Sequence, residues 1–358
     1  MKKFLSTASI AALTMIAGSS HAAQSGDLKI TWIDVEGGAA TLFVAPTGES
    51  LLFDTGYEGN GDRDAKRILD ATKKAGLTKI DHLVISHWHG DHVGGLAALS
   101  KLIPLGKFYD HGDGVEAADR ARLEGYKAIA GANRTILKAG DTIPLGPVQI
   151  RVLVSEGPVI ATPVNGGGPN ANCANAPLQA PGAPENIRMV GLSVTYNNFK
   201  YAGLSDADWS REMELACPVN KLGRVNLYLT NRHGGLDNSG APALLNAIQP
   251  QVVMLNNGPR KGLGQKVENL KILNVGYTPY ETNSFLRYAK LPGIEGVWQG
   301  HKSMIDPDPA HNTAPDMIAN LEEGAGDAGN AITATVAADG KFTITNTRNN
   351  FSKTYQAK

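Results

Sequence analysis

The sequence has little cysteine, few aromatic residues, no excess of either charge and no long apolar run after its N-terminus. Its 358 residues include two cysteines, which excludes a disulfide-dense scaffold and a zinc ribbon built from cysteines alone. Lys and Arg together number 34, as do Asp and Glu, so the basic excess typical of a nucleic-acid-binding protein is missing. The hydrophobic share of 42% is nevertheless that of a globular protein rather than a disordered one.

The first 22 residues have the pattern of a secretory signal peptide. Two lysines follow Met1, residues 4–18 carry no charge, and residues 20–22 give the small-x-small pattern of a cleavage site. The uncharged run of about 15 residues is shorter than the roughly 20 that span a bilayer. We therefore expect residues 1–22 to be removed. A single domain over residues 23–358 would remain, periplasmic or secreted and without a membrane segment.

Export changes the interpretation of the two cysteines, because it places them in an oxidising compartment. A disulfide between Cys173 and Cys217 is then favoured, and two free thiols are the alternative. Cys173 lies in residues 156–186, a stretch rich in Pro, Gly, Asn and Ala without a clear strand or helix pattern. Because so long a loop in a compact domain is usually functional or disordered, we expect a lid or rim of a site. The alternative is that residues 156–186 form a surface loop without a functional role.

Short β-branched runs alternate with amphipathic stretches along the remaining chain. The predicted strands are residues 28–35, 41–45, 50–53, 82–86, 107–109, 135–137, 148–154, 189–196, 200–203, 225–230, 252–255, 296–298, 332–336 and 341–345. The predicted helices are residues 64–75, 93–103, 117–129, 208–215, 242–247 and 265–273. Strands with interleaved helices in both halves, without repeats or a linker, predict one layered α/β domain.

Three histidines and one aspartate lie within six residues, at 87–92, directly after a predicted strand. Imidazole and carboxylate groups suit Zn²⁺, Mn²⁺ or Fe. In an extended or turning segment, His87 and His89 project the same way and can bind one metal. Asp91 and His92 come round the turn and can bind a second. The spacing therefore predicts a metal centre.

The chain resembles the metallo-β-lactamase superfamily in four motifs. Residues 86–95, SHWHGDHVGG, resemble its HxHxDH signature, and residues 53–56, FDTG, resemble its first motif. Residues 203–206, GLSD, resemble the strand end with a bridging aspartate, and residues 232–235, RHGG, the last histidine motif. The resemblance implies the four-layer αββα sandwich of that fold and two divalent metal ions, either zinc or manganese.

Within the superfamily, the likeness is closer to the competence-protein DNA-uptake nuclease domain and its secreted relatives. Residues 33–38, IDVEGG, and residues 228–235, YLTNRHGG, resemble motifs of that group. Glu36, Ala39 and Arg232 depart from its pattern, so the substrate does not carry over.

The resemblance also implies a role for each motif residue. The implied metal ligands are His87 and His89 for the first metal, Asp91, His92 and His233 for the second, and Asp206 bridging both. Asp206 is preferred over Asp208 because it follows a strand end, whereas Asp208 suits a helix N-terminus. Asp54 is expected to support the ligand loop by hydrogen bonds rather than to bind metal.

The first metal would normally take a third histidine. His111 is the sole histidine between His92 and Asp206, and a surface loop position, or water completing the site, is the alternative. His301 is expected at the surface, or else at the site as a substrate binder or proton donor.

Other polar residues carry weaker expectations. His82 is expected to be structural, and His311 is a weak candidate for the site. Arg232 either holds a phosphate or carboxylate or is an exposed charge at a strand end.

A site of this composition predicts hydrolysis, because two divalent ions lower the pKa of a bridging water and supply hydroxide. Asp91 and Asp206 are the expected catalytic carboxylates. We expect a secreted or periplasmic metallo-hydrolase that acts on a small phosphoester or related ester. A β-lactamase or lactonase is the alternative, and a metal-binding module without catalysis is the non-enzymatic one. The balanced charge predicts a small-molecule substrate and no dedicated nucleic-acid surface, and the oligomeric state stays open.

Overall fold

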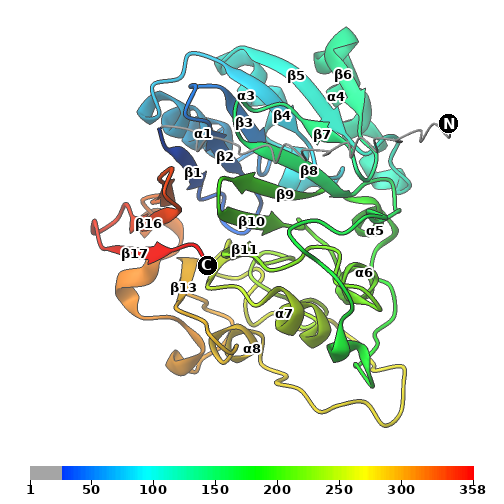
Figure 1. Ribbon diagram of the computed structural model, residues 1–358. Coiled ribbons are helices and arrows are strands. Elements are labelled where there is room, and N and C mark those ends of the chain that lie inside the picture. Colours follow the sequence, from blue (N-terminus) through cyan, green and yellow to red (C-terminus); the bar gives the residue numbers. More distant parts are fainter. Residues whose placement is uncertain (1–25) are drawn as a thin grey trace, which may run out of the picture.

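The computed structural model describes residues 26–358, and the predicted signal peptide lies outside them (Figure 1). Two β-sheets face each other, and helices pack on the outer side of each. One core of buried side chains fills the space between the sheets. Each sheet also has a second core on its outer side, where its helices pack against it. This is the predicted four-layer αββα sandwich.

The first sheet has nine strands in the order β17-β16-β15-β1-β2-β3-β4-β5-β6. Their bounds are β1 (Leu28–Trp32), β2 (Thr41–Val44), β3 (Ser50–Phe53), β4 (Ile80–Val84), β5 (Leu105–Asp110), β6 (Arg134–Ile136), β15 (Ile332–Val336), β16 (Lys341–Asn346) and β17 (Ser352–Gln356). Its strands β3, β4 and β5 run parallel, with Leu51 opposite His82 and Val84 opposite Tyr109.

The second sheet has eight strands in the order β14-β13-β12-β11-β10-β9-β8-β7. Their bounds are β7 (Thr142–Ile143), β8 (Gln149–Val154), β9 (Gly191–Tyr196), β10 (Phe199–Gly203), β11 (Leu227–Leu229), β12 (Val252–Leu255), β13 (Gly296–His301) and β14 (Ile318–Asn320). Strands β10 to β14 run parallel. The carboxyl ends of parallel strands meet at one edge of a sheet, the usual place for a binding site in α/β folds.

The helices lie outside the two sheets. They are α1 (Arg63–Lys74), α2 (Gly90–Val93), α3 (Leu96–Leu102), α4 (Arg120–Ala130), α5 (Pro184–Arg188), α6 (Trp209–Ala216), α7 (Pro242–Ile248) and α8 (Ser284–Ala289). The helix predicted over 93–103 is divided, because the chain of α2 and α3 passes very close to residues 55–58. A Cβ atom on Gly94 or Gly95 would overlap backbone atoms of Glu58 or Thr55.

The predicted helix over 265–273 is wrong. This segment pairs instead with the loop at 175–179, through the Gln179–Ile272 bridge and the bond from the Leu273 amide to the Leu178 carbonyl. The prediction also missed α8, whose N-cap Asn283 accepts a bond from the Leu286 amide, and the short strands β7, β14 and β17. Every helix among residues 26–358 is too short or too polar to cross a bilayer.

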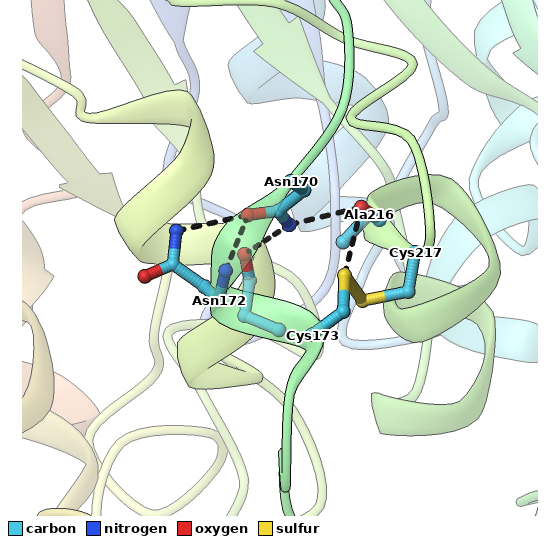
Figure 2. The surroundings of a disulfide bond; sticks show 6 residues. Asn170, Asn172, Cys173, Ala216 and Cys217 are labelled. Carbon is cyan, nitrogen blue, oxygen red and sulfur yellow. Dashed lines mark hydrogen bonds between the residues drawn. A yellow bond between two sulfur atoms is a disulfide. The ribbon is translucent and has the colours of Figure 1, made fainter.

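The disulfide between Cys173 and Cys217 is confirmed, and it joins residues 156–186 to the end of α6 (Figure 2). Asn170 strengthens this junction, because its side-chain amide donates to the Ala216 carbonyl at 2.9 Å and its side-chain oxygen accepts from the Asn172 amide at 3.0 Å. The far end of the segment packs beside the histidine loop through Glu185. Its role as a lid or rim stays a prediction.

Candidate metal centre

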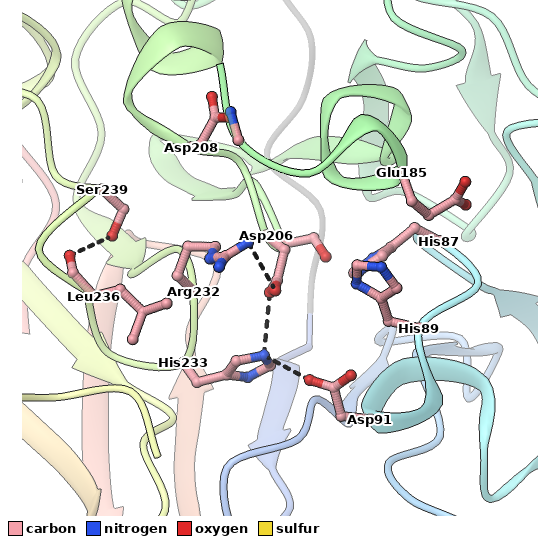
Figure 3. A network of polar contacts seen from close by, with 12 residues as sticks. His87, His89, Asp91, Glu185, Asp206, Asp208, Arg232, His233, Leu236 and Ser239 are labelled. Atoms are coloured by element: carbon pink, nitrogen blue, oxygen red, sulfur yellow. Dashed lines mark hydrogen bonds and ion pairs between the residues drawn. The ribbon is translucent and has the colours of Figure 1, made fainter. Parts of the chain in front are cut away.

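The predicted ligands meet because each follows the carboxyl end of a parallel strand. In the first sheet, Asp54 follows β3 and residues 86–92 follow β4. In the second, Asp206 follows β10 and His233 follows β11. Figure 3 shows Asp91 and His89 approaching from one side and Asp206, Arg232 and His233 from the other. The site therefore lies between the two sheets' edges.

Four predicted ligands form one tight group. The ligand atoms of Asp91, His92, Asp206 and His233 all lie within 4.8 Å of one another. His233 Nε2 is 2.9 Å from Asp91 Oδ2 and 3.2 Å from Asp206 Oδ1, and His92 Nε2 is 3.3 Å from Asp206 Oδ1. The resemblance assigned Asp91, His92 and His233 to the second metal and Asp206 to both metals, and the structure brings the four residues together.

Both imidazoles of this group are held from outside, so that their Nε2 atoms face inward. His92 Nδ1 lies 2.8 Å from Asp54 Oδ2, and His233 Nδ1 lies 3.3 Å from the Gly38 carbonyl oxygen. Asp54 is fully buried and also accepts bonds from the Ser86 amide and hydroxyl. This is the supporting role expected for Asp54, since such partners fix the orientation of a ligating histidine.

The charges of the group favour a cation. Burial alone would raise the pKa of the Asp206 carboxyl, but the imidazoles of His233 and His92 hold this pKa well below its usual range. The same balance, with His92 as the largest opposing charge, lowers the pKa of Asp91. Both carboxylates are therefore ionised in a buried place, where an unbalanced negative charge is costly.

Asp206 provides a direct test of whether a metal ion fits. Its Oδ1 atom is buried and accepts no hydrogen bond, although two imidazole nitrogens lie at ion-pair distance. Buried oxygens without a partner are rare in folded proteins. A divalent cation that takes oxygen and nitrogen ligands would satisfy this atom together with the inward Nε2 atoms, so the residues fit such an ion.

His87 and His89, the pair expected at the first metal, also lie close together, but they offer fewer ligand atoms than the four-residue group. His87 Nε2 lies 3.0 Å from His89 Nδ1, while His87 Nδ1 lies 3.0 Å from the Ser86 hydroxyl. His89 Nε2 lies 3.3 Å from Glu116 Oε2, which leaves Nδ1 turned towards His87. Glu116 thus holds His89 in the way that Asp54 holds His92.

His111 does not supply the third ligand that was expected for the first metal. It is fully buried, its Nε2 lies 2.7 Å from Glu185 Oε1, and its ring packs against Trp88. Within residues 26–358 it forms no group of three with His87 and His89. The prediction fails because Glu185, from the far end of the 156–186 segment, pairs with the side chain that elimination had assigned to the metal.

Two cations flank the four-residue group. Arg232 NH1 is 3.9 Å from Asp206 Oδ2, and its buried Nε atom has no hydrogen-bond partner. The Lys261 ammonium contacts Asp91 Oδ2. Sequence reasoning named Arg232 but missed Lys261, Glu116 and Glu185. For Lys261 a signal existed, because residues 256–261 follow the carboxyl end of β12 as the candidate ligands follow their strands.

The surface position expected for His301 is wrong, and its role as a substrate binder or proton donor stays a prediction. It is fully buried, and its Nε2 lies 2.6 Å from Asp34 Oδ1, so it buttresses the turn that carries Gly38. His311 pairs with Asp306 at 2.7 Å, outside the four-residue group.

Two expectations about residues beside the ligands are confirmed. His82 has a structural role, bonded to Glu49 at 2.9 Å and to Tyr109 at 3.2 Å. Asp208 caps α6 by accepting a bond from the Arg211 amide at 3.0 Å.

We expect Asp54→Asn to weaken metal binding about 10- to 100-fold, as loss of a partner to a ligating histidine typically does. Asparagine tolerates the left-handed backbone of position 54, at φ 66°, so the fold should persist. Isothermal titration with Zn²⁺ measures the effect. Asp64→Asn is the matched control, because this buried carboxylate bonds the Tyr57 amide and Arg63 rather than a ligand. Equal losses in both variants would contradict the role of Asp54.

Residues 33–174 match the model of the metallo-beta-lactamase superfamily. Atrochrysone carboxyl ACP thioesterase of Emericella nidulans is 38% identical over 79 residues, which are 22% of this chain and 25% of that protein. Coenzyme F420H(2) oxidase of Methanothermobacter marburgensis is 29% identical over 112 residues, 31% of this chain and 26% of that protein. The chain thus spans about a quarter of the length of these curated relatives.

Solved structures also resemble the chain. The metallo-beta-lactamase fold protein YhfI from Bacillus subtilis is 12% identical, with a TM-score of 0.46 over 77% of this chain and 96% of that one. A putative metal-dependent hydrolase from Parabacteroides distasonis is 14% identical, with a TM-score of 0.40 over 76% and 92%. The likeness to the competence-protein nuclease domain stays a prediction. The matched model covers residues 33–174, which include the histidine loop, so this part of the chain is similar to the metallo-beta-lactamase superfamily, and the four-layer sandwich around the loop is the fold that the resemblance implied.

Proposed function

We propose that the protein is a metal-dependent hydrolase with two divalent cations, zinc or manganese. The observation that carries the proposal is the group of Asp91, His92, Asp206 and His233, in which inward nitrogens and ionised carboxylates face one point. Divalent cations in such a group lower the pKa of a water molecule towards neutrality and so supply hydroxide for attack on an ester. The fungal relative named a thioesterase supports an ester-type substrate.

The chain's own residues supply the remaining steps. Asp91 has its carboxylate beside His233 Nε2 and is suited to orient the attacking water and to accept its proton. Asp206 lies on the opposite side of the group and fixes the spacing of the two ligand sets. Arg232, whose Nε atom has no hydrogen-bond partner, is suited to bind an anionic oxygen of the substrate.

A small phosphoester or related ester is the proposed substrate class. Arg232 and Lys261 bring two positive charges to the edge of the centre, which favours a substrate with negative charge on or beside the scissile group. The disulfide between Cys173 and Cys217 supports the proposed periplasmic or secreted location, because disulfides persist in oxidising compartments.

We expect the purified protein to contain two equivalents of zinc or manganese per chain, measured by inductively coupled plasma mass spectrometry. Hydrolysis of bis(4-nitrophenyl) phosphate should exceed that of a chromogenic cephalosporin and an acyl lactone, and a chelator should abolish it reversibly. If the cephalosporin or the lactone reacted faster, the proposed substrate class would be that compound's class and not the phosphoesters. Failure to bind any divalent metal would refute the enzyme proposal, and metal without any turnover would favour the binding module.

A further inference from the structure

Lys261 lies at the metal centre and contacts a candidate metal ligand directly. The Lys261 ammonium contacts Asp91 Oδ2, lies 2.8 Å from the Tyr57 hydroxyl, and sits 5.1 Å from the centre of the Tyr57 ring. Its side chain is 32% exposed. A charged amine bonded to a predicted metal ligand is unusual, because the ammonium and the metal compete for the same carboxylate oxygen.

The loop that carries Lys261 is fitted closely to the site. Gly262, at φ 87°, lies so near His233 that a Cβ atom would overlap the His233 carbonyl. Gly258 approaches the Glu36 carbonyl in the same way, and its amide bonds the Lys261 carbonyl at 3.0 Å. The backbone at 258–262 is thus held between the 36–38 turn and His233. The close backbone contacts of this loop therefore place Lys261 at the centre.

Two cationic side chains partly offset the charge of the carboxylates before a metal binds. Asp91 faces Lys261, and Asp206 faces Arg232 at 3.9 Å. A divalent cation bound to Asp91 displaces the ammonium from that oxygen, but Tyr57 and the loop keep the amine close by. Two positive charges a few ångströms apart then repel each other. An anion that contacts the metal and the lysine at once removes this repulsion.

We propose that Lys261 and Arg232 form a binding site for a dianionic, phosphate-like group, and that this group and the metal strengthen each other's binding. The inference rests on the proposed metal centre and narrows its substrate class. Because binding linkage is reciprocal, an anion that tightens the metal must itself be tightened by the metal to the same degree. The site would then select esters whose scissile group carries two negative charges.

The test is the affinity for Mn²⁺ of the full-length protein, by isothermal titration with and without inorganic phosphate. In the wild type, saturating phosphate should lower the Mn²⁺ dissociation constant by about tenfold, within the range of typical coupled sites. In Lys261→Met, the metal should bind more tightly than in the wild type when phosphate is absent, and phosphate should change its affinity less than about twofold. Lys261→Arg keeps the charge and should keep most of the coupling.

Lys266→Met is the matched control, because Lys266 is exposed on the same loop and should leave both affinities unchanged. A wild type that binds Mn²⁺ without any effect of phosphate would overturn the inference, as would a Lys261→Met variant that keeps the coupling. If Lys261→Met does not fold, Lys261→Gln gives the same comparison. A wild type that binds no metal would instead refute the proposed function, so the two failures are distinguishable.

Discussion

Asp206→Asn is expected to reduce hydrolysis by about 10³-fold or more, because metal-ion catalysis contributes several kcal/mol to such reactions. The substitution preserves the shape of the side chain but removes the negative charge that faces His92 and His233. Oδ1, the buried oxygen without a hydrogen bond, loses most of its attraction for a cation. Metal content should fall below two equivalents, while circular dichroism should report an unchanged fold. The kinetic and metal measurements are made on the same preparation.

Asp208→Asn gives the matched control two residues away. Asp208 is also buried, but its carboxylate caps α6 by accepting bonds from the Arg211 amide and the Ser210 hydroxyl. Its substitution should lower the free energy of unfolding by about 1 kcal/mol, as for a weakened helix cap, and leave metal content intact. If Asp208→Asn lost metal and Asp206→Asn kept it, the bridging assignment would belong to Asp208.

Replacing both cysteines, as Cys173→Ser with Cys217→Ser, is expected to lower the free energy of unfolding by about 4 kcal/mol in the chain-entropy model. The bond closes a loop with a sequence separation of 44, and the unfolded chain regains that freedom when the bond is absent. It also fixes residues 156–186 to the end of α6, where Asn170 already bonds the Ala216 carbonyl. Urea denaturation with saturating metal measures the loss.

Chemical reduction of the wild-type protein should reproduce the loss seen in the double variant, since both remove the same covalent bond. A single Cys217→Ser variant should lose as much as the pair. If the reduced protein or a cysteine variant unfolded at the same urea concentration as the oxidised wild type, contacts other than the disulfide would hold residues 156–186 in place. Catalysis at low temperature should survive in each variant, because neither cysteine contacts the metal ligands.

The candidate ligands and the supporting Asp54 could be predicted because their motifs resemble those of a known family and follow strand ends. Asp54, Asp206 and His233 each follow a short apolar strand, and parallel strands present their carboxyl ends at one edge, so motif order was enough. The fold class followed from the same alternation of strands and helices. Both depend on local patterns that a single sequence displays.

Residues whose partners lie far away in sequence could not be predicted. Glu185 pairs with His111 across 74 positions, and that contact leaves no local pattern. Lys261 reaches Asp91 across 170 positions, and although its loop follows a strand end, no local pattern shows which side chain of the loop enters the site. His301 failed for the same reason, because Asp34 lies 267 positions away and buries it. The helix expected over 265–273 has suitable composition, but pairing with the loop at 175–179 determines its backbone instead.

The position of the four-residue group between the two sheets has a mechanical consequence. Asp91 and His92 belong to the first sheet's loops, and Asp206 and His233 to the second's, so a cation bound by all four acts as a reversible cross-link between the two halves of the sandwich. At a free metal concentration a hundred times the dissociation constant, such a link adds about 2.7 kcal/mol to the folded state. The two sheets then cannot separate unless the ion is released. A chelator that removes the ion should therefore lower the stability of the whole fold.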